Sequence, residues 1–397
     1  MKDLPALLGN KPVFEERIPI ARPLVPAFEE FAAELESVFA SGILTKGPRL
    51  RRFEETVAER LGVKYAIAVS SCTSGLMLTY QAHGLTGDVV VPSFTFMATV
   101  SALVWAGVRP IFADVGLATA NLDPRAAEAA ITPETTAIVA AHTFGNPAEI
   151  EELISVAERH NLRLIFDAAH AIGSLYKETP CAQFGDAHVF SLTPTKLVVA
   201  GEGGIVVTNN SEVAEKIRVG REYGNSGDYD SAFAGINARM PEINATLAQH
   251  SLNGLESAVQ QRNRIAAFYQ ERLNDVPGLD FQQVRTGNRS SYNDFSIIVD
   301  SDAFGLSRDE LADALAAENI DTRKYYDPPV HRQTAYSKFA PSEEALPNTE
   351  LLASRILHLP IWSDMNVEIA AGVCQAVERS HQCAGMISEA RRAAAYA

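Results

Sequence analysis

The chain has 397 residues, and its 34 Lys and Arg against 49 Asp and Glu give a formal net charge of −15. This length suffices for a sizeable buried core in one large domain plus a smaller one, or in two comparable domains. The negative charge argues against nucleic acid or an anionic membrane as partner, so any anionic ligand must be held locally by backbone amides, helix N-termini or a few basic residues.

The cysteines and the N-terminal segment indicate the compartment. Cys72, Cys181, Cys374 and Cys383 are scattered, with neither a C-x-x-C pair nor the His spacing of a zinc site. We therefore expect no metal centre and a reducing environment. The first 26 residues lack the apolar core of a signal peptide, and no stretch approaches eighteen uninterrupted apolar residues. The sequence predicts a cytoplasmic protein without a membrane partner.

Seven short β-branched runs lie between residues 64 and 210, separated by stretches with helical apolar spacing such as 97–107 and 147–160. The runs are "KYAIAVS", "DVVVP", "RPIFADV", "TAIVAAH", "LRLIFDA", "AHVFSL" and "GGIVVTN". Because both alternating positions are apolar, we predict strands buried on both faces of a mostly parallel sheet, in an α/β domain. Chemistry is then expected at the strand ends.

The segment 239–275 has the pattern of a long helix or helix pair that bridges two domains, with Gly254 as a candidate break. After it, "DFSIIVD" resembles an edge strand. A helix follows, with Ser307 as N-cap and Glu310 completing a capping box.

The C-terminal part continues with the Pro-rich loop "YYDPPVH" and helices near 349–357 and 365–379, and "ISEARRAAAYA" reads as a terminal helix. We find no internal repeat and no low-complexity linker. The expected organisation is a large α/β domain at 1–255, with an N-terminal arm, packed closely against a small α+β domain at 256–397.

One lysine has an unusual sequence context. In "FSLTPTKLVVAGEGG", Lys196 precedes an apolar run and a glycine-rich turn. A lone lysine is usually a solvated surface group. Here desolvation would lower the pKa of the ammonium, the condition under which an amine becomes a nucleophile that forms Schiff bases.

A carboxylate stands at the end of an expected strand, where ligands of parallel sheets bind. Asp167 ends the run "LRLIFD", and taken alone it is equally well explained as a helix N-cap. Paired with a Schiff-base lysine, it supplies what pyridoxal 5'-phosphate needs, because the carboxylate keeps the pyridine nitrogen protonated and the ring becomes an electron sink. Lys196 and Asp167 together predict this cofactor, with pyridoxamine 5'-phosphate as its second form.

The cofactor's phosphate requires hydroxyls and free amides. In "VSSCTSGLMLTY", Thr73 and Ser74 would head a helix N-terminus, and Ser191 is a further candidate donor. Simple helix capping is the alternative, and the two are compatible. Phe96 in "PSFTFMAT" follows a strand and a proline, so it is either a ring that stacks on the cofactor or ordinary core.

The ordered motifs resemble a known family. These are "SSCTSGL", "PSFTFMAT", "NLDP", "HTFGNP", "FDAAHAIG", "FSLTPTK…GEGG", "GINARMPE" and "YYDPPVH". From about residue 20 to 378 the chain looks like the DegT/DnrJ/EryC1/StrS sugar aminotransferases, of fold type I among pyridoxal phosphate enzymes. "ALLGNKPVF", "CTSGL" and "FDAAHAIG" further resemble the branch that acts at C4 of dTDP-4-keto-6-deoxyglucose in antibiotic sugar pathways.

The resemblance implies a role for each matching residue. Lys196 would bind the cofactor covalently, Asp167 would face the pyridine nitrogen, His170 the ring hydroxyl, and Phe96 would stack on the ring, while Thr73, Ser74 and Ser191 would hold the phosphate. Asn237, in "GINARM", would reach the phosphate of the neighbouring subunit. The resemblance therefore implies a homodimer with shared active sites.

The implied reaction is a ping-pong transamination in which Lys196 serves as base and acid. The amino donor would be glutamate or glutamine, and the acceptor a nucleotide-linked keto-sugar. For part of the diphosphate contacts we name the group around "DTRKYYDPPVH", each of which is otherwise an ordinary surface residue: Arg323, Lys324, Tyr326 and His331. The chain departs from the family at Cys72, at Leu192-Thr193 and at Asn293, on the substrate side.

Other functions stay open from the sequence. A keto-cyclitol of the scyllo-inosose type, or a sugar aminated at C3, would fit the same motifs. Related dehydratases carry histidine in place of the lysine, so Lys196 counts against that chemistry. A sensor or regulator that kept the fold would bind the cofactor without amino transfer.

Overall fold

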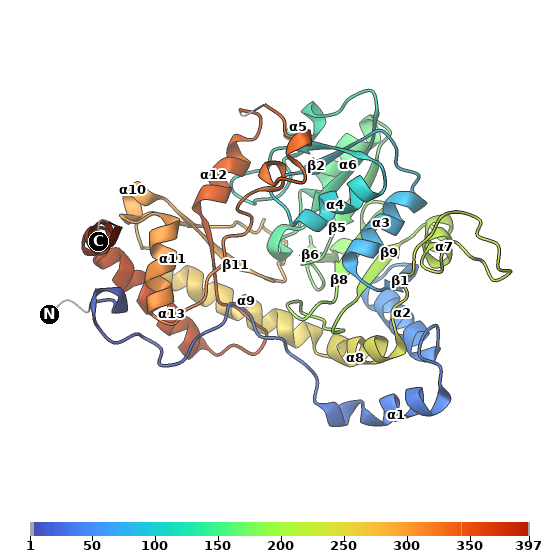
Figure 1. Ribbon diagram of the computed structural model, residues 1–397, viewed down its shortest axis with the longest axis horizontal. Helices are drawn as coiled ribbons and strands as arrows, with labels where there is room; N and C mark the ends of the chain where they lie inside the picture. Colours follow the sequence, from blue (N-terminus) through green and yellow to red (C-terminus); the bar gives the residue numbers. More distant parts are fainter. Residues whose placement is uncertain (1–3, 343, 396–397) are drawn as a thin grey trace.

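The computed structural model describes residues 4–342 and 344–395. The larger lobe is organised around a seven-stranded sheet with the order β1-β9-β8-β5-β4-β2-β3 (Figure 1). Its strands are β1 (Tyr65–Val69), β2 (Asp88–Pro92), β3 (Arg109–Ala113), β4 (Thr135–Ala141), β5 (Arg163–Asp167), β8 (Ala187–Ser191) and β9 (Gly204–Thr208). Only β9 runs against its neighbours, so the predicted seven strands and mostly parallel sheet are confirmed.

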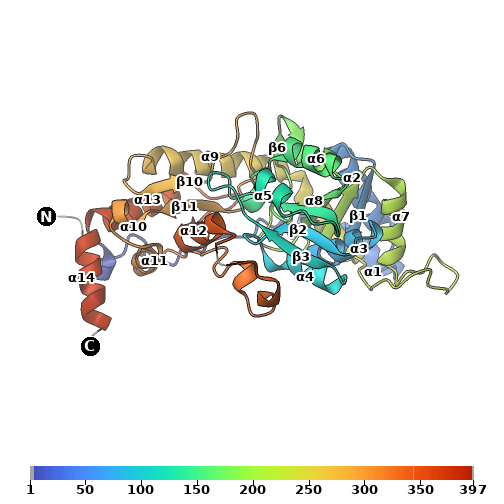
Figure 2. The same ribbon diagram turned by 90° about the horizontal axis from the view of Figure 1, so that it is seen from above.

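Helices cover both faces of this sheet (Figure 2). Ile67 and Val69 of β1 pack into one buried apolar cluster, whereas Ala66 and Ala68 pack into another on the opposite face. The alternation follows from the two-residue period of a strand and explains why both positions are apolar. The helices are α1 (Ala32–Ser41), α2 (Pro48–Leu61), α3 (Cys72–Ala82), α4 (Met97–Trp105), α5 (Pro124–Ala129), α6 (Ile150–Arg159), α7 (Ser211–Gly220) and α8 (Glu242–Asn253), and a two-stranded hairpin adds β6 (Leu175–Tyr176) and β7 (Thr179–Pro180).

The smaller lobe holds an antiparallel three-stranded sheet with the order β10-β11-β12. The long helix α9 leads into this lobe from α8, as Figure 1 shows. The elements are α9 (Leu255–Leu273), β10 (Leu279–Phe281), β11 (Phe295–Val299), α10 (Ser301–Phe304), α11 (Arg308–Ala317), α12 (Pro347–Arg355), β12 (Ile356–Leu359), α13 (Val367–Gln382) and α14 (Ala384–Ala395).

Most local expectations for this half are confirmed. Gly254 separates α8 from α9, and the Ser307–Glu310 capping box starts α11. The terminal helix is α14, and the last two residues of the predicted helix, 396–397, lie outside the described residues.

One expectation is wrong. The run "DFSIIVD" forms β11 in the centre of its sheet, not at an edge. The reason is β12, which pairs with the other side of β11 and whose four residues directly follow a helix.

The N-terminal segment belongs to both lobes. Leu7, Phe14 and Ile18 pack against the apolar core of the smaller lobe. The buried carboxylate of Glu318 accepts hydrogen bonds from the backbone nitrogens of Ala6 (2.8 Å) and Val13 (2.7 Å). Farther along, α1 packs against α8 of the larger lobe. The predicted domain boundary at residue 255 stays a prediction. The N-terminal segment, although it was assigned to the larger domain, contributes to the core of the smaller lobe.

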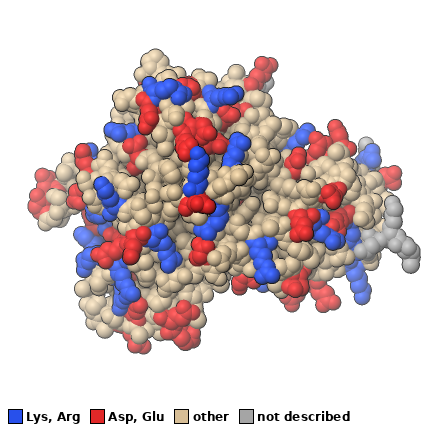
Figure 3. Space-filling view, turned by 180° about the vertical axis from the view of Figure 1, so that it is seen from behind, with Lys and Arg blue, Asp and Glu red and all other residues tan. Residues whose placement is uncertain are grey.

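The surface carries both signs of charge. Figure 3 shows acidic and basic side chains intermingled over one face of the molecule. Within the described ranges, no helix has the length and apolar character needed to cross a membrane.

A buried carboxylate joins the start of α8 to the start of α2. Glu242 is fully buried, and its side chain accepts hydrogen bonds from the backbone nitrogens of Gly47 (2.9 Å), Arg49 (2.9 Å) and Leu50 (3.0 Å). These are the donors that a helix leaves unpaired in its first turn, where a negative charge is favourable.

We expect Glu242→Ala to lower the free energy of unfolding by about 3–5 kcal/mol, because three backbone donors lose their shared charged acceptor. The measurement is the shift in urea midpoint at constant m-value. The control is Glu256→Ala, which removes the half-exposed partner of Arg289 and should cost less than about 1 kcal/mol. Equal effects of the two substitutions would contradict the capping role.

Candidate active site

A cavity of about 310 Å³ lies at the carboxyl ends of β5 and β8. Six of the residues predicted to be catalytic or to bind the cofactor line it together: Asp167, Lys196, Thr73, Ser191, Phe96 and His170. Ligands of α/β sheets bind at this edge.

The strand pairing brings the carboxylate and the amine to the same edge. β5 and β8 are parallel neighbours, Asp167 pairs with Val189, and the backbone nitrogen of Ala168 donates to the carbonyl of Val189 (2.9 Å). The chain then leaves β8 and turns back, since the nitrogen of Ala200 donates to the carbonyl of Leu192 (2.8 Å). Lys196 is carried on this turn into the cavity.

Asp167 is a buried carboxylate whose two oxygens are both engaged. Thr99 Oγ1 lies 2.7 Å from one oxygen, and the backbone nitrogen of Ala169 donates to the other (3.1 Å). Burial raises the pKa of Asp167, while these hydrogen bonds and the charge of Lys196 oppose the rise. A buried carboxylate of this kind is stabilised by a cation placed opposite it.

Lys196 is largely removed from solvent. Burial lowers the pKa of its ammonium, and the nearby Asp294, Cys72 and Asp167 oppose this shift. A lowered pKa increases the neutral fraction of the amine near pH 7, which is the nucleophilic form.

The phosphate end of the predicted site is the start of α3. The helix N-cap is Ser71, whose Oγ accepts a hydrogen bond from the backbone nitrogen of Ser74 (3.1 Å). The hydroxyl of Ser74 donates back to the carbonyl of Ser71 (2.9 Å) and does not line the cavity. Thr73, Ser191 and Ser71 do line it, and Ser71 was not among the residues predicted to hold the phosphate.

Two rings border the cavity where the cofactor ring is expected. Phe96 is half exposed although it is a large apolar side chain, and it precedes α4. Burial, with a contribution from the charge of Lys196, lowers the pKa of His170 to about 3, so this imidazole is neutral near pH 7. Stacking by Phe96 and the place of His170 beside the ring hydroxyl stay predictions.

The four residues expected to contact the diphosphate do not lie together in the structure. Of the four, only Tyr326 lines the cavity. Lys324 forms an ion pair with Asp309 (2.7 Å), and Arg323 is exposed outside the lining. His331 is buried between Ser93 Oγ, 2.7 Å from Nδ1, and Glu350, 2.8 Å from Nε2. Lys324 and His331 are thus engaged by other side chains of the protein and do not line the cavity.

Other lining residues escaped the sequence analysis. Asp294 and Tyr325 face the cavity from the smaller lobe, and Ile20 from the N-terminal segment. Tyr325 stands next to Tyr326 in the motif "YYDPPVH", whereas no local motif signals Asp294 or Ile20. Asn237 is exposed and lies outside the lining, so its expected contact with a neighbouring subunit stays a prediction.

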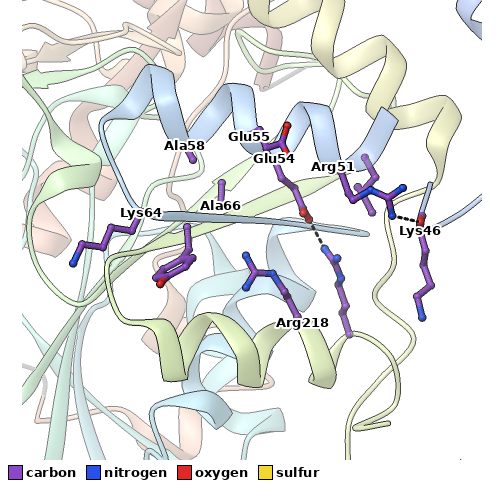
Figure 4. A pocket seen from close by; sticks show the side chains of 11 residues that line it. Lys46, Arg51, Glu54, Glu55, Ala58, Lys64, Ala66 and Arg218 are labelled. Carbon is purple, nitrogen blue, oxygen red and sulfur yellow. Dashed lines mark hydrogen bonds and ion pairs between the residues drawn. The ribbon is translucent and has the colours of Figure 1, made fainter. Parts of the chain in front are cut away.

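A second cavity, of about 410 Å³, lies between α2, β1 and α7. Glu54 pairs there with Arg221 (2.5 Å), while Lys64 and Arg218 project nearby (Figure 4). None of the predicted site residues lines this cavity. Across residues 4–342 and 344–395, no cluster of three or more His, Cys, Asp or Glu side chains is arranged to hold a metal ion.

The cavity at the carboxyl ends of β5 and β8 fits pyridoxal phosphate by its chemistry, since it offers an amine largely removed from solvent, a buried carboxylate and hydroxyls at a helix N-terminus. A model of the DegT/DnrJ/EryC1/StrS aminotransferase family matches residues 27–378. The chain belongs to this family. Its members depend on pyridoxal phosphate, and the chain is accordingly a sugar aminotransferase of fold type I.

Relatives of this family are similar over almost the whole chain. The spore coat polysaccharide biosynthesis protein SpsC of Bacillus subtilis (strain 168) is 34% identical, over 91% of this chain and 96% of its own. The dTDP-4-amino-4,6-dideoxy-D-glucose transaminase of Shigella dysenteriae is 33% identical, with the same coverage of 91% and 96%. The solved structure of DesI in the presence of its TDP-sugar product has a TM-score of 0.90 and 35% identity, and covers 98% of both chains.

We expect Lys196→Ala to lower turnover by about 10⁴-fold, because the variant loses both the nucleophile and the proton-transferring group. The fold should be kept, since the truncated side chain projects into a cavity. Steady-state kinetics and circular dichroism measure the two effects. Lys177→Ala, which removes an exposed lysine paired with Glu151, is the control and should leave turnover unchanged. Turnover surviving in the Lys196 variant would refute the assigned role.

Proposed function

We propose that this aminotransferase transfers an amino group from glutamate to C4 of dTDP-4-keto-6-deoxyglucose. The observation that carries the proposal is the burial of Lys196 and Asp167 in one cavity at the sheet edge. The choice of acceptor is supported by the similarity to the Shigella dysenteriae transaminase and to DesI, which was solved with a TDP-sugar product.

Lys196 and Asp167 have different parts in the proposed reaction. When bound, pyridoxal phosphate supplies an electrophilic carbon and a ring that accepts electrons. Lys196 Nζ would hold the group through that carbon, and the free amine would accept the proton that the donor Cα gives up and supply a proton to the acceptor carbon. Asp167 holds the proton on the ring nitrogen, because a buried carboxylate favours a cation opposite it.

The hydroxyls of Ser71, Thr73 and Ser191 and the free amides of the first turn of α3 would hold the phosphate. This is consistent with an acidic chain that must bind anions locally, since helix N-termini favour negative charge. Phe96 offers its exposed ring face to the flat cofactor.

We further propose a homodimer with shared active sites. Several large apolar side chains on the N-terminal segment and α1 are exposed, which is unusual for a monomer surface: Leu24, Val25, Phe28, Phe39, Ile43 and Leu44. Asn237 is exposed at the base of a projecting loop that carries the fully exposed Tyr229. A self-complementary interface over these segments would place Asn237 at the phosphate of the neighbouring site.

The acceptor is tested with the protein in its amine-loaded form, prepared by treatment with glutamate. dTDP-4-keto-6-deoxyglucose should restore the visible absorption of the lysine-bound cofactor, while a C3 keto-sugar nucleotide and scyllo-inosose should not. Stopped-flow absorbance measures the rates, and Lys196→Ala is the control that cannot return to this form. A faster response to scyllo-inosose or to the C3 keto-sugar would overturn the proposed acceptor.

Shared sites predict complementation between two defective variants. Lys196→Ala lacks the base and Asn237→Ala lacks the contact offered to the neighbour, so mixed dimers contain one intact site. After dissociation and random reassembly, about a quarter of all sites should be active. Activity of the mixture no greater than the mean of the two variants would contradict the shared site.

A further inference from the structure

The chain places a second carboxylate, Asp294, in the active-site cavity. Asp294 directly precedes β11 in the smaller lobe, yet it lines the same cavity as Lys196 and Asp167. Its side chain is only 15% exposed. A carboxylate this far removed from water is costly unless a donor or a cation compensates it.

The segment that carries Asp294 is fixed to the larger lobe. The backbone nitrogen of Asn293 donates to the carbonyl of Phe144 (3.0 Å), and Ser291 Oγ donates to the carbonyl of His170 (2.6 Å). Behind it, the buried guanidinium of Arg262 donates to the carbonyls of Tyr292 (3.0 Å) and Asn293 (2.9 Å). The segment therefore holds His170 by its backbone and presents Asp294 beside the His170 ring.

The two carboxylate oxygens of Asp294 differ in their hydrogen bonding. Oδ2 accepts a hydrogen bond from the Asn293 amide (2.7 Å) and lies 3.7 Å from His170 Nδ1. No described residue donates a hydrogen bond to Oδ1, and no described Lys or Arg forms an ion pair with this carboxylate. Asp167 differs, because both of its oxygens are hydrogen bonded.

The groups that face this carboxylate come from several elements. His170 lies on the loop after β5, His358 on β12, Lys196 after β8, and Tyr325 and Tyr326 on the loop before Pro328. Burial would raise the pKa of Asp294, but His170, His358, Lys196 and the Asn293 amide outweigh it, so its pKa lies below the usual value. Both histidines have lowered pKa values because they are buried, and the cationic groups that act on Asp294 are Lys196 and the buried guanidinium of Arg262, whose pKa burial lowers to about 10.

We propose that Asp294 is a positioning residue of this active site: its carboxylate orients the His170 ring through Nδ1 and sets a fixed negative charge against Lys196 Nζ. The inference rests on the proposed function for the role of Lys196. With Asp294 ionised, the proton on Nζ is retained to higher pH, also when Nζ is bound to the cofactor. The 3.7 Å between His170 Nδ1 and Oδ2 is longer than a hydrogen bond, so the carboxylate acts on the ring by its charge, which favours the tautomer with the proton on Nδ1 and leaves Nε2 unprotonated.

The negative charge of Asp294 raises the pKa of Lys196. Burial lowers the pKa of this amine, and of the opposing charges Asp294 is the largest, ahead of Cys72 and Asp167, while Arg262 acts in the same direction as burial. Replacing Asp294 by the isosteric asparagine removes the charge and keeps the volume. The proton on Nζ should then be lost at lower pH.

The test is a pH titration of the visible absorption of the cofactor-loaded protein, without substrate. We expect Asp294→Asn to move the transition of the lysine-bound cofactor down by about one pH unit or more, a tenfold change in proton affinity. Asp294→Glu restores the charge and should return the transition toward that of the wild type. Glu202→Gln is the matched control, because it removes a carboxylate from the mouth of the same cavity, where Glu202 is exposed to solvent. Its transition should stay within about 0.3 unit of the wild type, because water screens an exposed charge.

A second measurement does not depend on the cofactor. Nitrogen chemical shifts of histidine-labelled protein report which ring nitrogen of His170 carries the proton. We expect Nδ1–H in the wild type and a mixture of tautomers in Asp294→Asn, with the folded state verified by circular dichroism.

The outcomes separate this inference from the proposed function. A shifted transition in Asp294→Asn together with an unshifted Glu202→Gln supports the inference, even if the acceptor sugar proves to be a different one. A folded Asp294→Asn protein that titrates as the wild type does, or an equal shift in Glu202→Gln, would overturn it and leave Asp294 as a packing residue. A wild-type protein that shows no lysine-bound cofactor would instead refute the proposed function, and the inference with it.

Discussion

Two charged groups that are both kept out of water, the Lys196 amine and the Asp167 carboxylate, are the constraint on which this molecule depends. Each would be unfavourable alone in a buried site, because a charge removed from water needs a partner. The parallel pairing of β5 and β8 places them at one end of the sheet, and the buried apolar clusters on both faces fix those strands. The cofactor of this family completes the arrangement, since it offers a carbon to the amine and a ring nitrogen to the carboxylate.

The strands, the two charged site residues and the helix cap that follow local sequence patterns could be predicted from the sequence. The seven strands were recognisable because each run is apolar at both alternating positions, which only a doubly covered sheet requires. Asp167 was recognisable because it directly ends such a run, and Lys196 because it is a charge set against an apolar run. The Ser307–Glu310 capping box was equally local, and the structure has both of its hydrogen bonds.

The parts that depend on how the lobes meet could not be predicted in this way. Asp294 stands before a strand of the smaller lobe, and only the contacts of its segment with Phe144 and His170 bring it to the cavity. His331 shows the opposite case: a polar residue in a loop looked available for a ligand, but folding places it between Ser93 and Glu350. In both cases partners distant in the sequence decide the role, and no local pattern records them.

The central claim is that Lys196 is the residue that binds the cofactor. Borohydride reduction of the loaded protein makes the lysine–cofactor bond permanent, and peptide mass spectrometry then locates it. The cofactor mass is expected on the peptide that contains Lys196, at one equivalent per chain. Attachment to any other lysine, or no covalent cofactor at all, would contradict the account.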